Sequence, residues 1–241
     1  MMMLPENQRD TPVLCADSIG KRFGDVRVLV AATLHVPAGR IIGLFGRNGS
    51  GKSTLMKIMA GQLRADHGYI QFNGHVYHTR PAPHLLGRAG LYYAPTEGAL
   101  SRWFRFGEQL AAVCKHTGND DRLKHTIELF RLDGVLERTP QSFSGGESRR
   151  AALALACARN PRCLLSDEPL YGIDPNDREI LLSAFRTLAD EGCAVLVTGH
   201  ETPELLPACD RVAWLSGGSI SMLGDGRTAR LHHSFRRDYL G

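Results

Sequence analysis

The sequence contains no two cysteines at CxxC spacing, although six cysteines are distributed over its 241 residues. Several of them stand in apolar stretches, where a free thiol behaves as a small hydrophobic side chain. This pattern argues against a disulfide framework and favours a reducing compartment. Histidines are close neighbours only within residues 75–78 and 232–233. Because neither group is accompanied by a second ligand cluster, we expect no zinc site.

Long apolar runs are also missing. At no point do about 18 apolar residues follow one another, which is the length that a helix needs to cross a bilayer. The first ten residues, MMMLPENQRD, lack the basic region and the long apolar segment of a signal peptide. We therefore expect a cytoplasmic protein that works at a membrane only through a partner.

Clusters of one charge are absent too. The formal net charge is +4, and no run of five or more like charges occurs. This distribution is typical of a solvated, mildly basic surface, so no nucleic-acid partner is expected. With 43% hydrophobic and 22% charged residues, the composition is ordinary for a globular protein with one substantial core.

The apolar pattern predicts an α/β fold. Residues 41–45 form a nearly continuous apolar run, as expected for a strand that is covered on both faces. Similar runs occur at 163–166, 193–198 and 211–215, and an amphipathic segment at 174–189 separates two of them. Strands that alternate with helices predict a mainly parallel sheet.

Other segments depart from this alternation. Residues 13–23 and 34–36 predict two antiparallel edge strands, and residues 70–72 followed by Asn73-Gly74 predict a strand and a tight turn. Apolar residues between positions 103 and 130 recur instead at three- and four-residue spacing, which is typical of helices.

These patterns predict a single domain with two parts. Its core subdomain would span about residues 1–96 and 159–241, and a helical subdomain would be inserted at about residues 97–158.

A glycine-rich loop follows the first apolar run. Residues 46–53, GRNGSGKS, match the pattern GxxxxGK[ST] in full. Glycines allow successive N–H groups to point at phosphate oxygens, and the helix that follows adds the positive end of its dipole. Lys52 would reach the β- and γ-phosphates, and the Ser53 hydroxyl would hold magnesium. The predicted nucleotide-binding residues of this segment are Gly46, Asn48, Gly49, Ser50, Gly51, Lys52, Ser53 and Thr54.

A glycine-rich turn without nucleotide would be the structural alternative. The apolar strand before the loop and the helical spacing after it favour the phosphate-binding interpretation.

Two consecutive carboxylates, Asp167 and Glu168, end a later apolar strand. One would bind hydrated magnesium and the other would polarise the attacking water, because the metal prefers hard oxygen ligands and the water needs a base. An acidic helix start at Pro169 would explain the pair alone equally well. Downstream of a phosphate loop, the chemical interpretation is favoured.

A second glycine-containing helix start lies about twenty residues before these carboxylates. It consists of Ser144, Gly145, Gly146 and Glu147, and it has the small hydroxyl residue, glycines and helix N-terminus of a phosphate-binding segment. It could also be only a helix cap.

Along nearly its whole length the chain resembles an ABC-transporter nucleotide-binding domain. GRNGSGKST corresponds to the Walker A motif, FSGGE to the signature and CLLSDEP to Walker B. The resemblance implies a P-loop NTPase with a RecA-like, mainly parallel sheet, an antiparallel β subdomain and an inserted α-helical subdomain. The segments SGGE and SFRRDYLG look most similar to the branch of branched-chain amino-acid uptake and lipopolysaccharide-export ATPases.

The resemblance also implies an ATPase that uses ATP and Mg²⁺. Asp167 would support the metal and Glu168 would be the catalytic base. Lys52 would take part in catalysis by binding phosphate, and His200, the switch histidine, would hold the γ-phosphate and align the water. Phe23 would stack on adenine, and Asp174 would belong to the D-loop. A lone phenylalanine or histidine is more often core or surface, but the order and spacing of the motifs favour these roles.

In this family two domains enclose two ATP molecules, and each signature faces the other subunit's Walker A motif. Residues 144–147 would therefore complete a site in a second ABC ATPase subunit, as a homodimer or a heterodimer. A transmembrane permease subunit would be the further partner, holding the protein at the inner face of the cell membrane. The transported substrate and the direction of transport stay open.

The segment LYYAPTEGAL differs from the family at one position. Where the family has a glutamine that reaches magnesium and water, this chain has Thr96, followed by Glu97. A water molecule or a one-residue loop shift could fill the role, so that turnover continues. Otherwise the protein would be a slow ATPase, or its loop would be fitted to an unusual partner.

Three aromatic residues follow this segment. Trp103, Phe104 and Phe106 are candidates for the groove that receives the partner's coupling helix, although aromatic residues here could equally form subdomain core.

A functional alternative to transport is a nucleotide-switched regulatory module that dimerises on ATP and hydrolyses it slowly. A membrane-spanning partner would distinguish the transporter from this module.

Overall fold

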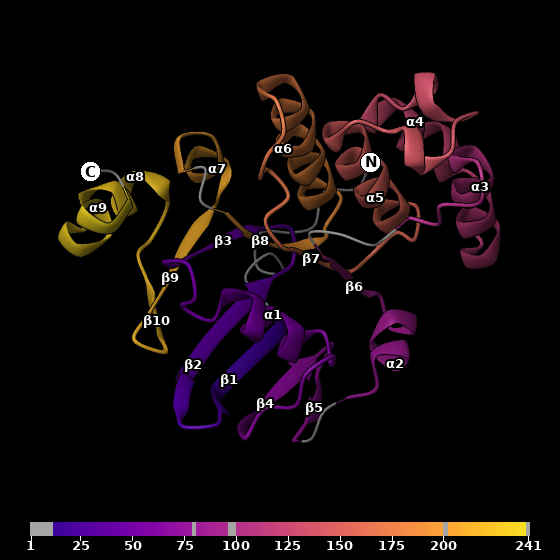
Figure 1. Ribbon diagram of the computed structural model, residues 1–241. Coiled ribbons are helices and arrows are strands. Elements are labelled where there is room, and N and C mark those ends of the chain that lie inside the picture. The colour runs from indigo at the N-terminus through magenta and orange to yellow at the C-terminus, as the bar shows by residue number, and fades with distance from the viewer. Residues whose placement is uncertain (1–11, 79–80, 96–99, 200–201, 240–241) are drawn as a thin grey trace.

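The computed structural model describes residues 12–78, 81–95, 100–199 and 202–239 (Figure 1). Within these ranges the chain forms two sheets, with helices packed around them. None of the described helices combines the length and the apolar character that a membrane span requires.

The larger sheet contains six strands in the order β10-β9-β3-β8-β7-β6. All its pairings are parallel except that of β9 with β10. The strands are β3 (Ile41–Phe45), β6 (Leu91–Ala94), β7 (Cys163–Ser166), β8 (Ala194–Thr198), β9 (Arg211–Ser216) and β10 (Ser219–Met222). Every residue of β3, β7 and β8 is buried, because helices or the second sheet cover both faces. The predicted mainly parallel sheet is therefore confirmed.

The smaller sheet is antiparallel, in the order β2-β1-β4-β5. Its strands are β1 (Pro12–Phe23), β2 (Val26–Pro37), β4 (His67–Phe72) and β5 (His75–Tyr77). Asn73 and Gly74 join β4 to β5 with φ angles of 48° and 82°. Two positive φ angles are typical of the two-residue hairpin turn, so the predicted strand and tight turn are confirmed.

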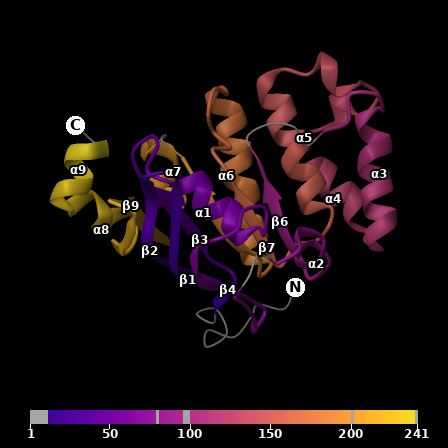
Figure 2. The same cartoon turned by 60° about the horizontal axis from the view of Figure 1, so that its bottom comes forward.

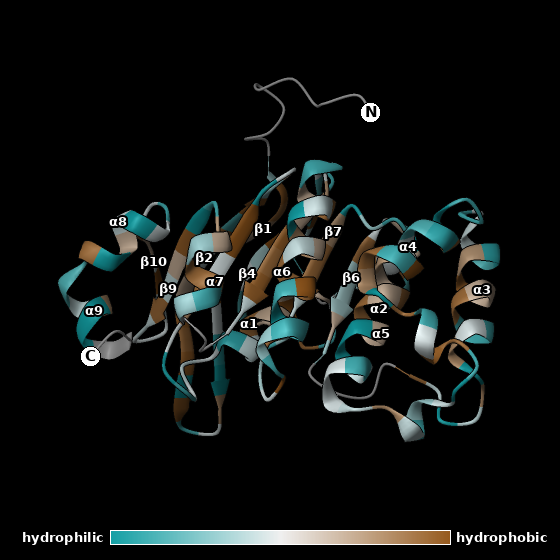
Figure 3. Ribbon diagram, turned by 90° about the horizontal axis from the view of Figure 1, so that it is seen from above, coloured by the Kyte–Doolittle hydropathy of each residue, from teal (hydrophilic) through white to brown (hydrophobic). Residues whose placement is uncertain are grey.

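Side chains that alternate along the parallel strands divide the core into two layers. Ile41 and Phe45 of β3 pack into one layer with residues of α6 (Pro175–Asp190) and α7 (Thr202–Ala208). Ile42 and Leu44 point to the opposite face, where they pack with the antiparallel sheet and α1 (Lys52–Met59). Figure 3 shows hydrophobic residues along several strands, and hydrophilic residues on the turns of α6 and α7 that face the viewer.

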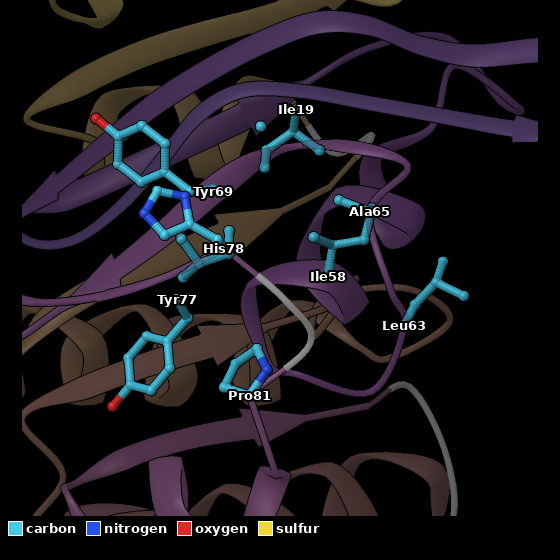
Figure 4. A pocket seen from close by; sticks show the side chains of 10 residues that line it. Ile19, Ile58, Leu63, Ala65, Tyr69, Tyr77, His78 and Pro81 are labelled. Atoms are coloured by element: carbon cyan, nitrogen blue, oxygen red, sulfur yellow. The ribbon is translucent and has the colours of Figure 1, made fainter.

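A small apolar hollow lies where the antiparallel sheet meets α1 (Figure 4). Ile19 of β1, Ile58 of α1 and Tyr77 of β5 contribute to its lining. Tyr69 also lines it, and its hydroxyl donates a hydrogen bond to Asp17 at 3.0 Å. The hollow belongs to the packing that holds α1 in place.

The remaining helices lie around the ends of the larger sheet. They are α2 (Pro83–Arg88), α3 (Phe106–Thr117), α4 (Arg122–Phe130), α5 (Gly145–Cys157), α8 (Gly226–Leu231) and α9 (His233–Tyr239), with short 3₁₀ turns at Asp133–Val135 and Pro140–Ser142. Figures 1 and 2 both show α3, α4 and α5 grouped beyond β6, at the opposite end from α8 and α9. The predicted helical insert contains α3, α4 and α5, and its subdomain boundaries stay a prediction.

The three aromatic residues before and at the start of α3 differ in exposure. Trp103 and Phe104 are 82% and 59% exposed, whereas Phe106 is 0% exposed. The Phe106 ring meets that of Phe143 edge-on, with ring centroids 6.0 Å apart. Helical periodicity places Phe106 on the same inward face as Leu110. The prediction that Phe106 lines a partner groove is therefore wrong, and its alternative, subdomain core, holds for this residue.

Replacing Phe106 or Phe104 by alanine tests whether each ring is part of the core. We expect Phe106→Ala to lower the free energy of unfolding by about 3–5 kcal/mol, because it removes a buried ring and leaves a cavity. Phe104→Ala should change it by less than about 0.5 kcal/mol, since much of that ring is already in water. Urea denaturation of the two variants measures both values, and equal losses would contradict the assignment of Phe106 to the core.

Candidate nucleotide-binding site

The loop between β3 and α1 can be formed only with glycine at certain positions. A Cβ atom on Gly46 would lie 2.5 Å from Ser50 Oγ and 2.7 Å from the carbonyl oxygen of Leu215. Gly51 has a φ of 105° directly before α1. Because these glycines have no side chain, the backbone can form a tight loop at the N-terminus of α1. N–H groups and the helix dipole attract anions at such a position.

Lys52, the first residue of α1, folds back over this loop. Its side chain is 5% exposed, and Nζ donates hydrogen bonds to the carbonyl oxygens of Gly46 at 2.6 Å and Arg47 at 3.4 Å. Burial lowers the pKa of Lys52, whereas the negative charges of Glu168 and Asp167 raise it. Burial is the largest of these effects, so the pKa of Lys52 is lowered overall, while loop carbonyl oxygens hold its ammonium group.

A cleft joins the loop to residues that are distant in the sequence. Its lining consists of Phe23, Val28, Asn48, Gly49, Ser50, Gly51, Lys52, Ser53, Thr54 and Glu168. Phe23 at the end of β1 is half-exposed, and Lys21 Nζ lies 5.5 Å from the centroid of its ring. The fold thus brings Phe23 to the phosphate loop, and its stacking on adenine stays a prediction. Val28 of β2 was not predicted, because a single valine in a strand carries no chemical signal.

Asp167 lies at the carboxyl end of β7 and is 5% exposed. Thr198 Oγ1 donates a hydrogen bond to its Oδ1 at 2.6 Å, and the Tyr93 hydroxyl donates one to its Oδ2 at 3.2 Å. The Asp167 N–H donates to the carbonyl oxygen of Ala94 at 3.1 Å. Burial raises the pKa of Tyr93, and the adjacent Asp167 carboxylate raises it further.

Sequence reasoning missed Tyr93 and Thr198. Their only signal is their position close to the ends of β6 and β8, two parallel strands whose carboxyl ends meet at the same edge of the sheet.

Glu168 has a left-handed backbone conformation, with a φ of 48°. For a residue other than glycine this conformation costs about 1–2 kcal/mol. The Glu168 N–H donates a hydrogen bond to Thr198 Oγ1 at 2.9 Å. Backbone strain that is held in this way is frequent at functional sites, and here it directs Glu168 into the cleft.

The second glycine-containing helix start forms a complete cap on α5. Ser144 Oγ accepts the Glu147 N–H at 3.1 Å, and Glu147 Oε2 accepts the Ser144 N–H at 2.7 Å. Arg138 Nη1 lies 2.8 Å from Glu147 Oε1 and holds this carboxylate from outside the helix. The structural alternative, a helix cap, is therefore confirmed, and the role of the segment in binding nucleotide stays a prediction.

Gly146 adds a steric constraint. A Cβ atom there would overlap the buried Asp177 carboxylate, which pairs with Arg150 Nε at 2.7 Å. Sequence reasoning missed Arg138, Arg150 and Asp177, since charged residues on helices usually lie on a solvated face.

Asp174 caps α6, accepting the Asp177 N–H at 3.0 Å. Backbone and side-chain hydrogen bonds from Asp177 lower the pKa of Asp174. The predicted D-loop role of Asp174 is not tested by this geometry. Thr96, Glu97 and His200 lie outside the described residues.

The oxygen donors of the cleft, together with Asp167 next to Glu168, fit a magnesium ion. Asp167, Glu168 and Ser53 offer carboxylate and hydroxyl oxygens, which are the ligands that Mg²⁺ prefers. Within the described ranges no three His, Cys, Asp or Glu side chains gather into a metal cage. Magnesium at nucleotide sites is usually held by one or two protein groups, phosphates and water, so this donor set is sufficient.

Comparisons with known proteins agree with this geometry. Residues 29–171 match the model of the family described as ABC transporter. A probable ABC transporter ATP-binding protein of Azorhizobium caulinodans is 32% identical, over 95% of this chain and 83% of the relative. The chain belongs to the ABC transporter family.

Other relatives of this ABC chain have more specific names. The lipopolysaccharide export system ATP-binding proteins of Escherichia coli and Haemophilus influenzae are 32% and 30% identical, over 95% of this chain and 97% of each relative. The predicted family is thus confirmed, and these relatives agree with the predicted likeness to lipopolysaccharide-export ATPases. The protein is an ATPase, the ATP-binding subunit that powers transport in an ABC system.

Solved structures show the same fold. An ATP-binding cassette of an ABC transporter aligns with a TM-score of 0.84 at 21% identity, over 95% of this chain and 97% of that one. A dimeric ATP-binding cassette bound to ADP and Pi aligns with a TM-score of 0.74 at 19% identity, over 86% and 96% of the chains. The predicted P-loop NTPase fold is confirmed.

The glutamate of the FSGGE signature predicts a pH dependence for this ABC subunit. The Arg138 side chain and the Ser144 N–H hold the pKa of Glu147 below its usual value of 4.5. A lowered pKa contributes stability that is present above the unfolded pKa and is lost as the pH falls through the folded value. Glu147→Gln keeps an acceptor for the cap but removes the charge.

We therefore expect wild type to be more stable than Glu147→Gln by about 1 kcal/mol at pH 7. The difference should disappear as the pH falls below 4.5. Urea denaturation between pH 3 and pH 7, with ~1-unit steps, measures it. A difference that stays constant over this range would contradict the charged interaction.

Proposed function

We propose that this subunit binds ATP and Mg²⁺ in the cleft between the phosphate loop, Phe23 and Glu168. The observation that carries the proposal is the lining of this cleft, in which an anion-binding loop, a buried ammonium group and a carboxylate converge. They come from β1, the start of α1 and the end of β7, so only the folded chain assembles them.

Each group has a distinct role in this proposal. Backbone N–H groups of residues 46–54 and the Lys52 ammonium would bind the phosphates, while Phe23 would stack on adenine. Glu168 would accept a proton from the attacking water, and His200 would hold the γ-phosphate.

Ser53 and Asp167 would hold the magnesium ion. When bound, Mg²⁺ neutralises charge on the phosphates during phosphoryl transfer. The paired hydroxyl and carboxylate suit this role because both are hard oxygen donors.

The functional unit would be a dimer. Within the described part of the chain, the lining of the cleft includes none of the signature residues 144–147. A second ABC ATPase subunit would supply Ser144, Gly145, Gly146 and Glu147 across a two-fold interface, and Asp174 would lie at that interface. A dimer of a related cassette bound to ADP and Pi supports this arrangement.

A membrane-spanning permease would be the second partner. The protein would then be cytoplasmic and attached to the inner face of the membrane through that permease. Relatives named for lipopolysaccharide export and ABC transport support this interpretation and do not favour the regulatory module. Exposed Trp103 and Phe104 remain candidates for the permease contact.

Steady-state ATP hydrolysis by the purified chain tests the proposal. We expect Glu168→Gln to reduce kcat by about 10²–10⁴-fold, because it removes the base but keeps the shape of the side chain. Static light scattering should show that this variant dimerises with MgATP. Glu128→Gln, at an exposed position on α4, is the matched control and should hydrolyse ATP like wild type. Equal activity of wild type and Glu168→Gln would refute the assignment.

The position of the missing glutamine gives a separate prediction. If Thr96 is a tolerated variation, Thr96→Gln should change kcat by less than about threefold, since water can replace the amide. A large gain in kcat would instead show that Thr96 restrains the ATPase. The same hydrolysis assay decides between these two hypotheses.

A further inference from the structure

Two hydroxyl groups bracket the paired carboxylates from neighbouring strands. β7 lies between β6 and β8, and the three strands run parallel. Thr198, the last residue of β8, is 0% exposed and reaches Asp167 from one side. Tyr93 of β6 reaches it from the other side. Neither residue belongs to the Walker A, signature or Walker B motif.

The Thr198 hydroxyl forms hydrogen bonds with both Asp167 and Glu168. A hydroxyl has one hydrogen and two acceptor positions. Its hydrogen is used on Asp167 Oδ1 at 2.6 Å, and its oxygen accepts the Glu168 N–H at 2.9 Å. One buried side chain thus sets the orientation of the proposed magnesium ligand and of the peptide that carries the proposed base.

Glu168 depends on this contact more than most residues would. Its φ of 48° is a conformation that residues with a side chain rarely adopt. Strained conformations persist only where the surroundings enforce them. The hydrogen bond from its N–H to Thr198 Oγ1 is such an enforcing contact.

Tyr93 completes the arrangement at the other carboxylate oxygen. Its hydroxyl donates to Asp167 Oδ2 at 3.2 Å, and the Asp167 N–H binds the neighbouring Ala94 carbonyl oxygen at 3.1 Å. An ionised carboxylate has about four acceptor positions. Two hydroxyl donors from neighbouring strands therefore orient this carboxylate.

We infer that Thr198, supported by Tyr93, is a positioning residue for ATP hydrolysis, which holds Asp167 and Glu168 in their working orientations. This inference rests on the proposed function, because it takes Asp167 as the magnesium ligand and Glu168 as the base. Groups that orient metal ligands from behind commonly change metal affinity or activity by about 10–100-fold when removed.

Two substitutions at position 198 separate positioning from packing. Thr198→Val keeps the shape and removes the hydroxyl, so kcat should fall by about 10–100-fold. The gain in ATP affinity on adding Mg²⁺ should shrink as well, as measured by titrating a fluorescent ATP analogue with Mg²⁺ and with EDTA. Thr198→Ser restores the hydroxyl and should return both values to within about threefold of wild type.

If Thr198 acts only through packing, the valine variant should be closer to wild type than the serine variant. Valine would then preserve activity and the Mg²⁺ effect, whereas serine, which lacks the methyl group, would lower the melting temperature. Thr126→Val, at a buried threonine in α4, is the control for the chemical change and should leave both readouts at wild-type values.

A second pair of variants keeps the test decisive if Thr198→Val fails to fold. Tyr93→Phe removes only the hydroxyl that meets Asp167, and the Mg²⁺ concentration for half-maximal ATP binding should rise several-fold. Tyr92→Phe is the matched control on the same strand, because the Tyr92 ring lies beside Arg159 on the other face. It should behave like wild type.

The outcomes separate the inference from the proposed function. If wild type hydrolyses ATP, Glu168→Gln does not, and Thr198→Val and Tyr93→Phe keep wild-type turnover and Mg²⁺ dependence, only the inference is overturned. If wild type shows no Mg²⁺-dependent binding of ATP, the proposed function fails and the inference falls with it. Loss in Thr198→Val with recovery in Thr198→Ser supports the inference.

Discussion

Parallel pairing of the central strands is the constraint on which the site depends. β3, β8, β7 and β6 all point the same way, so their carboxyl ends lie along one edge of the sheet. The phosphate loop leaves β3, and Asp167 and Glu168 follow β7 at this edge. In open α/β sheets ligands bind at such an edge, because loops from several strands converge there while the strands themselves stay rigid.

Two charged side chains at this edge, Lys52 and Asp167, are buried, and burial strengthens their interactions with neighbouring groups. Lys52 and Asp167 are both almost fully buried, and neither charge could be kept there without partners. Loop carbonyl oxygens accept from the lysine, and hydroxyl groups from two strands donate to the aspartate. These contacts hold a positive charge at the phosphate loop and a negative charge at the end of β7, where a phosphate and a magnesium ion would complement them.

The signature segment is also held by buried contacts, which join it to α6. Arg150 of α5 pairs with Asp177 of α6, and Gly146 leaves no room for a side chain beside that carboxylate. The position of the signature helix is therefore linked to the helix that begins after Asp174. A movement of α5 relative to the sheet would have to carry or break this ion pair, and breaking a buried ion pair is costly.

Contiguous motifs determined what could be predicted from the sequence. The phosphate loop, the pair Asp167-Glu168 and the SGGE segment each place their functional groups within a few neighbouring residues. The chemistry of these motifs can therefore be predicted from a short stretch of sequence. The apolar runs around the motifs predicted the strands and helices that carry them. The family, the α/β fold and the ATPase function follow from this local information.

Tertiary structure alone decided which single residues join the site. Tyr93 and Thr198 stand on different strands from Asp167, and no spacing in the sequence relates three strands of one sheet. Phe106 and its exposed neighbour Phe104 look alike in sequence, and only the packing of α3 buries one of them. Contacts between distant segments depend on strand order and helix packing, which arise from burial of the whole core rather than from any local pattern.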